Sequence, residues 1–353
     1  MRLKWYTRII GVTTVLVSAL LVLAPAPAAA QAVGKPHVVV ITMGGTIASR
    51  SDGAPMTPGA ALINAVPELA KYADIRVEEF TRVGSSQLTP DHWLRLSKRI
   101  NALFGEDREL AAIVITHGTD TMEETAFFLN LTVNDARPVV LTGSMRGSDE
   151  ISADGPANLL NAVRVAVSRQ SVGQGVLVVM NEDISDARDL QKTDNRRVQT
   201  FQSPQVGFLG SANPDTVVFA RRVLRPHTTA SEFDVSRVDS LPSVEMLTDY
   251  SGFDGALMSA AVGLKPRGVV LATFAGGRMS AGGRLALQRA SKASVPAVIA
   301  SRVPNGRMVG NPLGELPGVM ARDLPPNKAR VLLMLALTRT ADLREIQRLF
   351  DAY

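Results

Sequence analysis

The feature that most constrains the fold is a buried strand that leads through a polar turn directly into a helix. Residues 111–115 (AAIVI) are apolar, which is typical of a strand covered on both faces of a parallel sheet. Residues 116–121 (THGTDT) are small or polar, and two glutamates follow in the first turn of a predicted helix that begins at Met122. The turn of such a βα unit lies at the carboxyl edge of the sheet, where α/β proteins hold ligands.

This polar turn has two interpretations. As a plain connection, it would need Thr119 or Asp120 only as the N-cap of the helix that follows. Capping does not explain why a hydroxyl, a carboxylate and Gly118 occur together in one turn. We therefore interpret the turn as part of a ligand site, and capping stays open as the alternative.

The alternation of such units along the chain predicts the fold class. In the first half, predicted strands alternate with predicted helices: strands at 37–42, 75–80, 111–115, 138–142 and 175–180, and helices at 60–72, 89–104, 122–133 and 154–168. This order predicts an α/β protein with a large N-terminal domain built on a doubly wound parallel sheet. The alternation resumes after residue 243 and predicts a smaller C-terminal α/β domain, which ends in helix 327–338 and a helix capped by Thr340.

Composition changes divide the chain into four predicted segments. Residues 1–32 have a basic start, an apolar run and small residues before residue 32, which is typical of a secretory signal peptide. Residues 33–210 are the predicted N-terminal catalytic domain, 211–242 a proline-containing linker, and 243–353 the C-terminal domain. We expect a mature protein that is soluble in the periplasm and has no membrane segment after cleavage.

Charge and composition exclude several classes of function. Without residues 1–32 the formal charge falls from +5 to +2, because three basic residues and no acidic residue are lost. No Lys/Arg cluster argues for nucleic acid as a partner. The chain has no cysteine, which excludes thiol chemistry and thiolate metal sites, and its four histidines are scattered. We therefore expect neither a metal nor another cofactor.

Three predicted βα turns end in small polar groups, and parallel strands would bring them to one edge of the sheet. The first carries Thr46 behind two glycines, the second carries Ser85 and Ser86, and the third carries Thr119 and Asp120. A threonine hydroxyl becomes a nucleophile only with a nearby base. No histidine is well placed for that role.

Lys192, His117 and the glycines of the turns are further candidates for a role in the chemistry. Lys192 lies in an otherwise unexplained polar segment and is a candidate base if burial keeps it neutral, although its spacing alone favours a plain surface lysine. His117 is better explained as a strand-end hydrogen-bonding residue than as a catalyst. The N–H groups of three turn glycines are candidates for an oxyanion hole: Gly45, Gly118 and Gly143.

The polar groups of these turns suit a small zwitterionic ligand. Asp120 can hold a substrate ammonium, while Ser85 and loop N–H groups can hold a carboxylate. At this point the chain resembles a known family: residues 43–48 (MGGTIA) and 116–121 (THGTDT) look like the two signatures of bacterial L-asparaginases. Further stretches are similar to the exported type II branch: 64–67, 152–156, 192–193, 301–304 and 328–332.

The resemblance implies a function, a mechanism and an assembly. It implies hydrolysis of L-asparagine to L-aspartate and ammonia without a cofactor, by a homotetramer that is a dimer of dimers. It implies Thr46 as the nucleophile that forms an acyl-enzyme, and Thr119, Asp120 and Lys192 as a second catalytic triad. The implied substrate-binding residues are Gly45, Ser85, Ser86, Gly118, Asp120 and Ser144.

Three departures from the family pattern predict slow turnover. Met43 stands where the family usually has threonine, Met56 stands where it has the tyrosine that pairs with the nucleophile, and Gly276 replaces an asparagine that a neighbouring subunit lends. Three other functions stay open at this point. They are a glutaminase-asparaginase with L-glutamine as its main substrate, a non-catalytic periplasmic amino-acid binder, and a nucleotide-binding protein, which the missing P-loop lysine disfavours.

Overall fold

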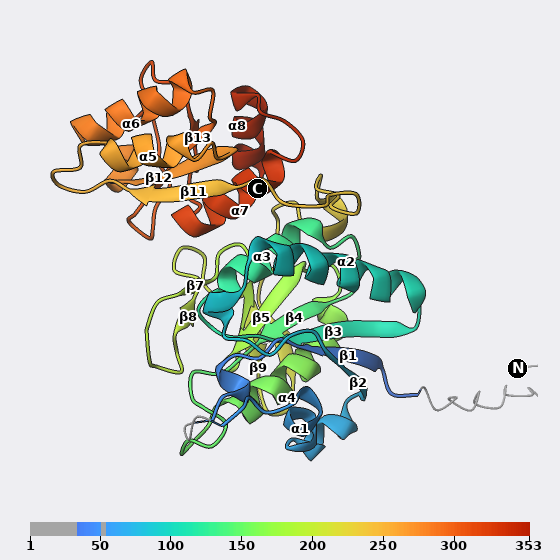
Figure 1. Ribbon diagram of the computed structural model, residues 1–353. Helices are drawn as coiled ribbons and strands as arrows, with labels where there is room; N and C mark the ends of the chain where they lie inside the picture. Colours follow the sequence, from blue (N-terminus) through green and yellow to red (C-terminus); the bar gives the residue numbers. More distant parts are fainter. Residues whose placement is uncertain (1–33, 51–53) are drawn as a thin grey trace, which may run out of the picture. The chain divides into compact units, whose positions relative to one another are not determined.

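A computed structural model describes residues 34–50 and 54–353 of the chain (Figure 1). The predicted signal peptide therefore lies outside the described residues. Two parallel-sheet domains follow, a large one with an eight-stranded sheet and a smaller one with a four-stranded sheet, which confirms the predicted fold class. Within the described part of the chain, no helix is both long enough and apolar enough to cross a membrane.

The large sheet contains five neighbouring parallel strands in the order β2-β1-β3-β4-β5. Their bounds are β1 His37–Thr42, β2 Asp74–Glu79, β3 Leu110–Thr116, β4 Val139–Thr142 and β5 Val176–Met180. β2 lies on one side of β1 and β3 on the other, so the direction in which strands are added reverses at β1. The crevice at such a switch point is where open α/β sheets bind ligands.

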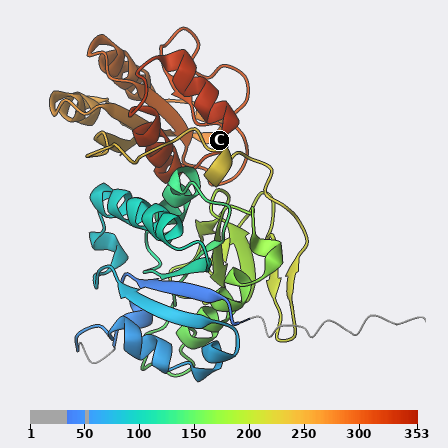
Figure 2. The same ribbon diagram turned by 90° about the vertical axis from the view of Figure 1, so that its right-hand side faces the viewer.

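Helices cover both faces of this sheet, which makes it doubly wound (Figures 1 and 2). On β3, Ile113 and Ile115 belong to the apolar cluster that includes α2 (Pro90–Glu106) and α3 (Met122–Thr132). The intervening Val114 belongs to the opposite cluster, which contains α4 (Gly155–Ala166) and receives Ile63 of α1 (Gly59–Asn64). A strand covered on both faces must be apolar at every position, which explains the continuous run in the sequence.

The predicted helix 60–72 is wrong as a single element. The structure has α1 followed by a separate 3-10 helix, Pro67–Lys71, with Pro67 at its first position. Proline lacks an N–H and disfavours a helical conformation in the residue before it, so the α-helix ends before Pro67 and the chain restarts as a 3-10 turn.

The polar segment after β5 contains strands that the sequence did not indicate. Asn181 (φ 50°) and Glu182 (φ 69°) form a two-residue turn that folds β6 (Asp183–Asp186) back against β5. β9 (Gly210–Ala212) and β10 (Val217–Phe219) extend the sheet beyond β6 by antiparallel pairing. Residues at the start of the predicted linker 211–242 thus contribute to the large sheet. A separate small ribbon pairs β7 (Gln191–Lys192) with β8 (Phe201–Gln202).

The second sheet is parallel throughout, in the order β11-β12-β13-β14. Its strands and helices alternate: β11 Val244–Thr248, α5 Ala256–Gly263, β12 Gly268–Thr273, α6 Ala281–Lys292, β13 Ala297–Ser301, β14 Val319–Met320, α7 Pro326–Ala336 and α8 Leu343–Ala352. α7 is buried along most of its length, as its apolar sequence predicts.

The predicted cap of the last helix is wrong. Asp342, not Thr340, is the N-cap of α8, and its Oδ1 accepts the N–H groups of Arg344 and Glu345. A carboxylate next to the helix can accept two of its free N–H groups at once, and it also suits the positive end of the helix dipole. The Thr340 hydroxyl instead accepts the N–H of Asp342.

Candidate active site

The turn after β1 has a backbone that only glycine adopts easily. Gly44 and Gly45 both have positive φ, of 88° and 82°. A Cβ on Gly45 would lie 2.3 Å from the Cα of Gly118, so the turn after β1 touches the turn after β3. Thr46 follows as the first residue of a short 3-10 helix, Thr46–Ala48, and remains partly exposed.

The turn that carries Ser85 meets the same place. A Cβ on Gly118 would lie 2.7 Å from the Ser85 hydroxyl oxygen, which accepts the N–H of Asp120 at 3.1 Å. The Ser85 carbonyl accepts the hydroxyl of Thr121 at 3.0 Å. The fold therefore brings together all three polar turns, as expected from the parallel arrangement of their strands. Ser85 is buried, whereas Ser86 is exposed.

A lysine from a distant part of the chain joins the β3 turn. Lys192 Nζ donates to the Thr119 hydroxyl at 2.9 Å and to Asp120 Oδ1 at 2.8 Å. The Thr119 side chain is buried, the Lys192 side chain is 18% exposed, and the Asp120 side chain is 63% exposed. Lys192 is thus not a plain surface lysine, and one face of the Asp120 carboxylate stays open to a ligand.

The capping interpretation of this turn is wrong. The N-cap of α3 is Thr121, and no side-chain hydrogen bond caps the helix there. The side chains of Thr119 and Asp120 contact Lys192 instead. The hydroxyl, the carboxylate and the glycine occur together because the first two face the lysine and the third allows close contact with Gly45 and Ser85.

His117 supports the turn from inside the protein. It is fully buried, with Nδ1 2.6 Å from the Gly118 carbonyl and Nε2 2.9 Å from the Thr125 hydroxyl. Because a carbonyl only accepts, Nδ1 carries the proton and Nε2 accepts from Thr125. Burial lowers the pKa of His117 to about 4, so the ring is neutral at neutral pH. These contacts agree with a hydrogen-bonding role.

Two of the three candidate oxyanion N–H groups are already used within the protein. The Gly45 N–H donates to the Val83 carbonyl at 3.1 Å, and the Gly143 N–H donates to Met180 Sδ at 3.2 Å. In the described residues, the Gly118 N–H has no such acceptor, so it is the best remaining candidate. The turn after β4 also buries Ser144, whose hydroxyl donates to the Arg146 carbonyl at 2.7 Å.

The surroundings of Thr46 differ from those of Thr119. No residue in the described ranges forms a hydrogen bond with the Thr46 hydroxyl. Met56 packs on the small apolar cluster of Ile47, Ala48 and Leu62, and its sulfur would lie 3.0 Å from a Cβ on Gly44. The thioether therefore lies beside the glycine turn, where it offers no strong proton acceptor. Gly276 has positive φ (66°) and open space around its Cα.

The described residues contain no group of three or more His, Cys, Asp or Glu side chains arranged to hold a metal ion. The ionic part of the site is the Lys192–Asp120 pair. One residue next to this pair was not singled out in the sequence. Glu123, which the sequence indicates only as a favourable charge in the first turn of α3, accepts the main-chain N–H of Lys192 at 3.0 Å.

This fold and site define an α/β enzyme class, in which a lysine links a threonine hydroxyl to a carboxylate at the switch point of a parallel sheet. Comparison with known families agrees with this class. Residues 37–225 match the family model "Asparaginase, N-terminal", and residues 243–350 match "Glutaminase/Asparaginase C-terminal domain". The chain belongs to the asparaginase family of amidohydrolases, enzymes that act on small-molecule amides.

Individual relatives and a solved structure cover nearly the whole chain. The L-asparaginase 2 of Bacillus subtilis (strain 168) is 40% identical over 90% of this chain and 87% of its own length. A probable periplasmic L-asparaginase of Haemophilus influenzae is 40% identical over 92% of this chain and 95% of its own length. The crystal structure of a probable cytoplasmic L-asparaginase from Campylobacter jejuni matches with a TM-score of 0.86 and 41% identity, over 90% of this chain and 100% of that one.

Proposed function

We propose that the protein hydrolyses L-asparagine to L-aspartate and ammonia through a threonine nucleophile and an acyl-enzyme. The contact of Lys192 Nζ with both Thr119 Oγ1 and Asp120 Oδ1 is the observation that carries the proposal. In its neutral form, a lysine between a buried hydroxyl and an open carboxylate can accept a proton through the hydroxyl. The carboxylate can hold a substrate ammonium at the same time. A protein that only binds an amino acid needs the carboxylate but not the buried threonine–lysine contact.

Asp120 and the Ser85 turn would bind the α-amino and α-carboxylate groups of the substrate. Asp120 is the exposed carboxylate of the site, so the α-ammonium can pair with it. Ser85 lies directly beside Gly118 and orients the main chain of Asp120. In this arrangement the side-chain amide of the substrate extends toward the glycine turn and Thr46. Gly45, Gly118, Ser86 and Ser144 complete the proposed substrate-binding residues.

The proposed reaction has two steps. Thr46 Oγ1 forms a bond with the amide carbon of the substrate, and the C–N bond breaks. The hydroxyl proton passes to the nitrogen, which leaves as ammonia. Water then attacks the resulting ester and passes a proton through Thr119 to the neutral Lys192 amine. The C–O bond to Thr46 breaks, and the proton held by Lys192 returns to Thr46 Oγ1, so Thr46 is again a hydroxyl, Lys192 is again neutral, and L-aspartate is released. The Gly118 N–H is the proposed donor to the oxyanion in both steps.

The principal rival substrate is L-glutamine, because the C-terminal family model carries both the glutaminase and the asparaginase name. The two substrates differ by one methylene, which is worth only about 1–3 kcal/mol in a pocket. The deciding experiment measures ammonia release from both amides with the purified mature protein. We expect kcat/KM to be higher for asparagine. A higher value for glutamine would reassign the substrate, and no release from either would leave only the binding function.

We also propose export to the periplasm and assembly as a homotetramer, a dimer of dimers. Residues 1–32 and the resemblance to exported relatives support export. N-terminal sequencing of the protein from the periplasm should find Gln31 or Val33 first, and a chain that still begins at Met1 would contradict this. Exposed apolar residues support self-association: within α5 only Met258 is buried, Leu257 is 56% exposed, and Leu264, the C-cap residue that follows α5, is 79% exposed.

A further inference from the structure

The segment that carries Lys192 is held by the first turn of α7, more than a hundred residues away in the sequence. This turn consists of Pro326, Asn327 and Lys328. It belongs to the C-terminal sheet domain, whereas Lys192 acts in the proposed site of the large sheet. Two separate sets of contacts join the turn to the lysine segment, one to the residues just before Lys192 and one to the main chain of Lys192 itself.

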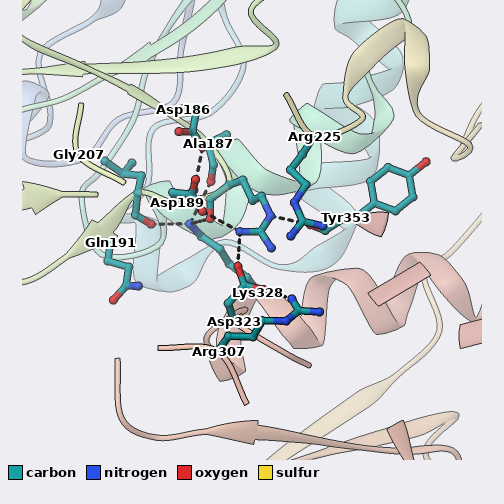
Figure 3. Close-up of polar contacts among 12 residues, drawn as sticks. Asp186, Ala187, Asp189, Gln191, Gly207, Arg225, Arg307, Asp323, Lys328 and Tyr353 are labelled. Atoms are coloured by element: carbon teal, nitrogen blue, oxygen red, sulfur yellow. Dashed lines mark hydrogen bonds and ion pairs between the residues drawn. The ribbon is translucent and has the colours of Figure 1, made fainter. Parts of the chain in front are cut away.

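The first set begins with a fully buried ammonium group. Lys328 is completely buried, and its Nζ donates to the carbonyl groups of Ala187 at 3.0 Å, Arg188 at 2.7 Å and Leu190 (Figure 3). Three N–H donors thus meet three carbonyl acceptors, which satisfies the ammonium without a carboxylate in direct contact. Desolvation lowers the pKa of Lys328, while the charges of Glu123 and Asp186 oppose that effect. These bonds hold the chain that leads into β7.

The second set reaches the main chain of Lys192 itself. Asn327 Nδ2 donates to Glu123 Oε1 at 2.6 Å, and the other oxygen of Glu123 accepts the Lys192 N–H at 3.0 Å. The orientation of the amide follows from a third bond, because Asn327 Oδ1 accepts the N–H of Lys328 at 3.0 Å. The Glu123 carboxylate therefore connects the start of α3, the start of α7 and the Lys192 main chain.

We propose that the first turn of α7 positions the proposed catalytic lysine, with Asn327 acting through Glu123 and Lys328 acting through the carbonyl groups of residues 187–190. Asn327, Glu123 and Lys328 are positioning residues, since none of them contacts Lys192 Nζ. Outside α7, Gln191 next to Lys192 donates to the Pro304 carbonyl at 3.3 Å, so the loop after β13 also holds this segment. The inference rests on the proposed function, in which Lys192 accepts a proton.

The test exchanges the two side chains of the Asn327–Glu123 pair. Asn327→Asp alone sets two carboxylates against each other. Adding Glu123→Gln restores the pairing, because the glutamine oxygen can accept the Lys192 N–H while its nitrogen donates to the introduced carboxylate. We expect Asn327→Asp to lower kcat by about 10²-fold, the effect of a misplacement near 1 Å. KM should change far less, and the double variant should recover most of kcat.

Control variants show whether a loss of kcat comes from a misplaced Lys192 or from a general loss of stability. Arg330→Ala removes another bond of α7, from its Nε to the Val244 carbonyl at 2.9 Å, and should leave kcat within about twofold of the parent. Lys328→Met should lower kcat as Asn327→Asp does. If that variant does not fold, the exchange pair alone decides the question. Thermal melts of every variant show whether kcat merely follows stability.

The outcomes discriminate between the two proposals. Equal kcat values for Asn327→Asp and the double variant, or losses that track Tm, would overturn the positioning role. A normal kcat for Asn327→Asp would also overturn it, provided that Lys192→Met is inactive. If Lys192→Met itself retains activity, the proposed function fails, whatever the exchange shows.

Discussion

Single residues in the site depend on one another, which makes their effects testable as a group. Lys192 contacts Thr119 and Asp120 at once, so removing any of the three changes the surroundings of the other two. Thr46 has no comparable partner within the described residues. The two threonines of the proposed mechanism therefore differ: the Thr119 hydroxyl has a hydrogen-bond partner in Lys192, and the Thr46 hydroxyl has none among the described residues.

Loss of any member of the lysine-linked group should remove most of the activity. We expect Thr119→Ala, Asp120→Ala and Lys192→Met each to lower kcat by about 10²–10⁴-fold, the typical contribution of general acid–base catalysis. Double variants should be little worse than single ones, because groups that act as a unit fail together. Ammonia release measures kcat. Lys98→Met, which removes only a bond to the Val238 carbonyl, is the control. Near-normal turnover by Lys192→Met would show that another group is the base.

Because the Thr46 hydroxyl lacks a hydrogen-bond partner among the described residues, we expect slow turnover. A hydroxyl introduced at position 56 should increase kcat. Met56 lies beside the glycine turn but cannot accept or relay a proton. We expect Met56→Tyr to increase kcat for L-asparagine by about tenfold or more, part of the 10²–10⁴-fold range of proton-transfer catalysis. Thr46→Ala should be inactive in both backgrounds. A fast parent that tyrosine does not improve would mean that Thr46 has another activator, and an active Thr46→Ala would reject the nucleophile.

The buried His117 predicts that the protein loses stability in mild acid. Its pKa is about 4 in the folded protein, against 6.5 for the unperturbed side chain. Between these values the unfolded chain binds a proton that the folded protein does not, so the free energy of unfolding decreases as the pH falls. The full effect is about 3 kcal/mol, present above pH 6.5 and lost toward pH 4.

Urea unfolding at pH 7 and pH 5 tests this. His117→Asn should reduce the difference between the two pH values, whereas His37→Asn, at an exposed position, should leave it unchanged. An undiminished difference in the His117 variant would show that other groups cause the acid sensitivity.

At the scale of elements, turns decide where strands pair. The two-residue turn between β5 and β6 has positive φ at both positions, yet its residues are Asn181 and Glu182 rather than the favoured Asn-Gly. A left-handed conformation in a residue with a Cβ costs roughly 1–2 kcal/mol. This conformation folds β6 onto the sheet and so shapes the segment that leads to Lys192.

Relief of this strain should stabilise the fold. We expect Glu182→Gly to raise the free energy of unfolding by about 1 kcal/mol, because glycine adopts positive φ without steric clash. Glu182→Ala removes the same charge but keeps the Cβ, so it should give no gain. Urea unfolding of the two variants measures the difference, and an equal gain from alanine would point to the charge rather than the backbone.

At the scale of the whole molecule, the C-terminal sheet leaves one side open. β11 is an edge strand, and near it Met246 is 48%, Tyr250 45% and Leu257 56% exposed. Exposed strand edges and apolar helix faces are the features that subunits cover. We therefore locate a contact of the proposed tetramer at β11 and α5.

Charged residues on this surface should weaken the assembly. We expect Leu257→Glu with Leu264→Glu to lower the mass measured by light scattering from that of a tetramer to that of a dimer or monomer. Val172→Glu, at an apolar residue that is 53% exposed near β5, is the control and should not change the mass. A tetramer that survives both charges would place the interface elsewhere.

The sequence by itself indicated most of the parallel strands and helices and the candidate side chains. Continuous apolar runs such as that of β3 identify strands buried on both faces, and the polar turn with Thr119 and Asp120 stands out because nothing local explains it. These signals are local, since periodicity and turn chemistry depend on residues a few positions apart. Parallel strands place their carboxyl ends at one edge of a sheet, so the sequence also correctly indicated that the turns after these strands would meet.

Only the tertiary structure decided what the distant residues do. The sequence alone favoured a surface lysine for Lys192 and an ordinary helix-start carboxylate for Glu123, because their partners lie in other elements. The strands β6, β9 and β10 were not recognised for a similar reason. Their short segments gain order from pairing, β6 with β5, β9 with β6 and β10 with β9, and not from their own pattern. Contacts across large sequence separations form only when the whole sheet is assembled, so the pairing of Thr119 with Lys192 and the link from Lys192 through Glu123 to α7 are properties of the fold.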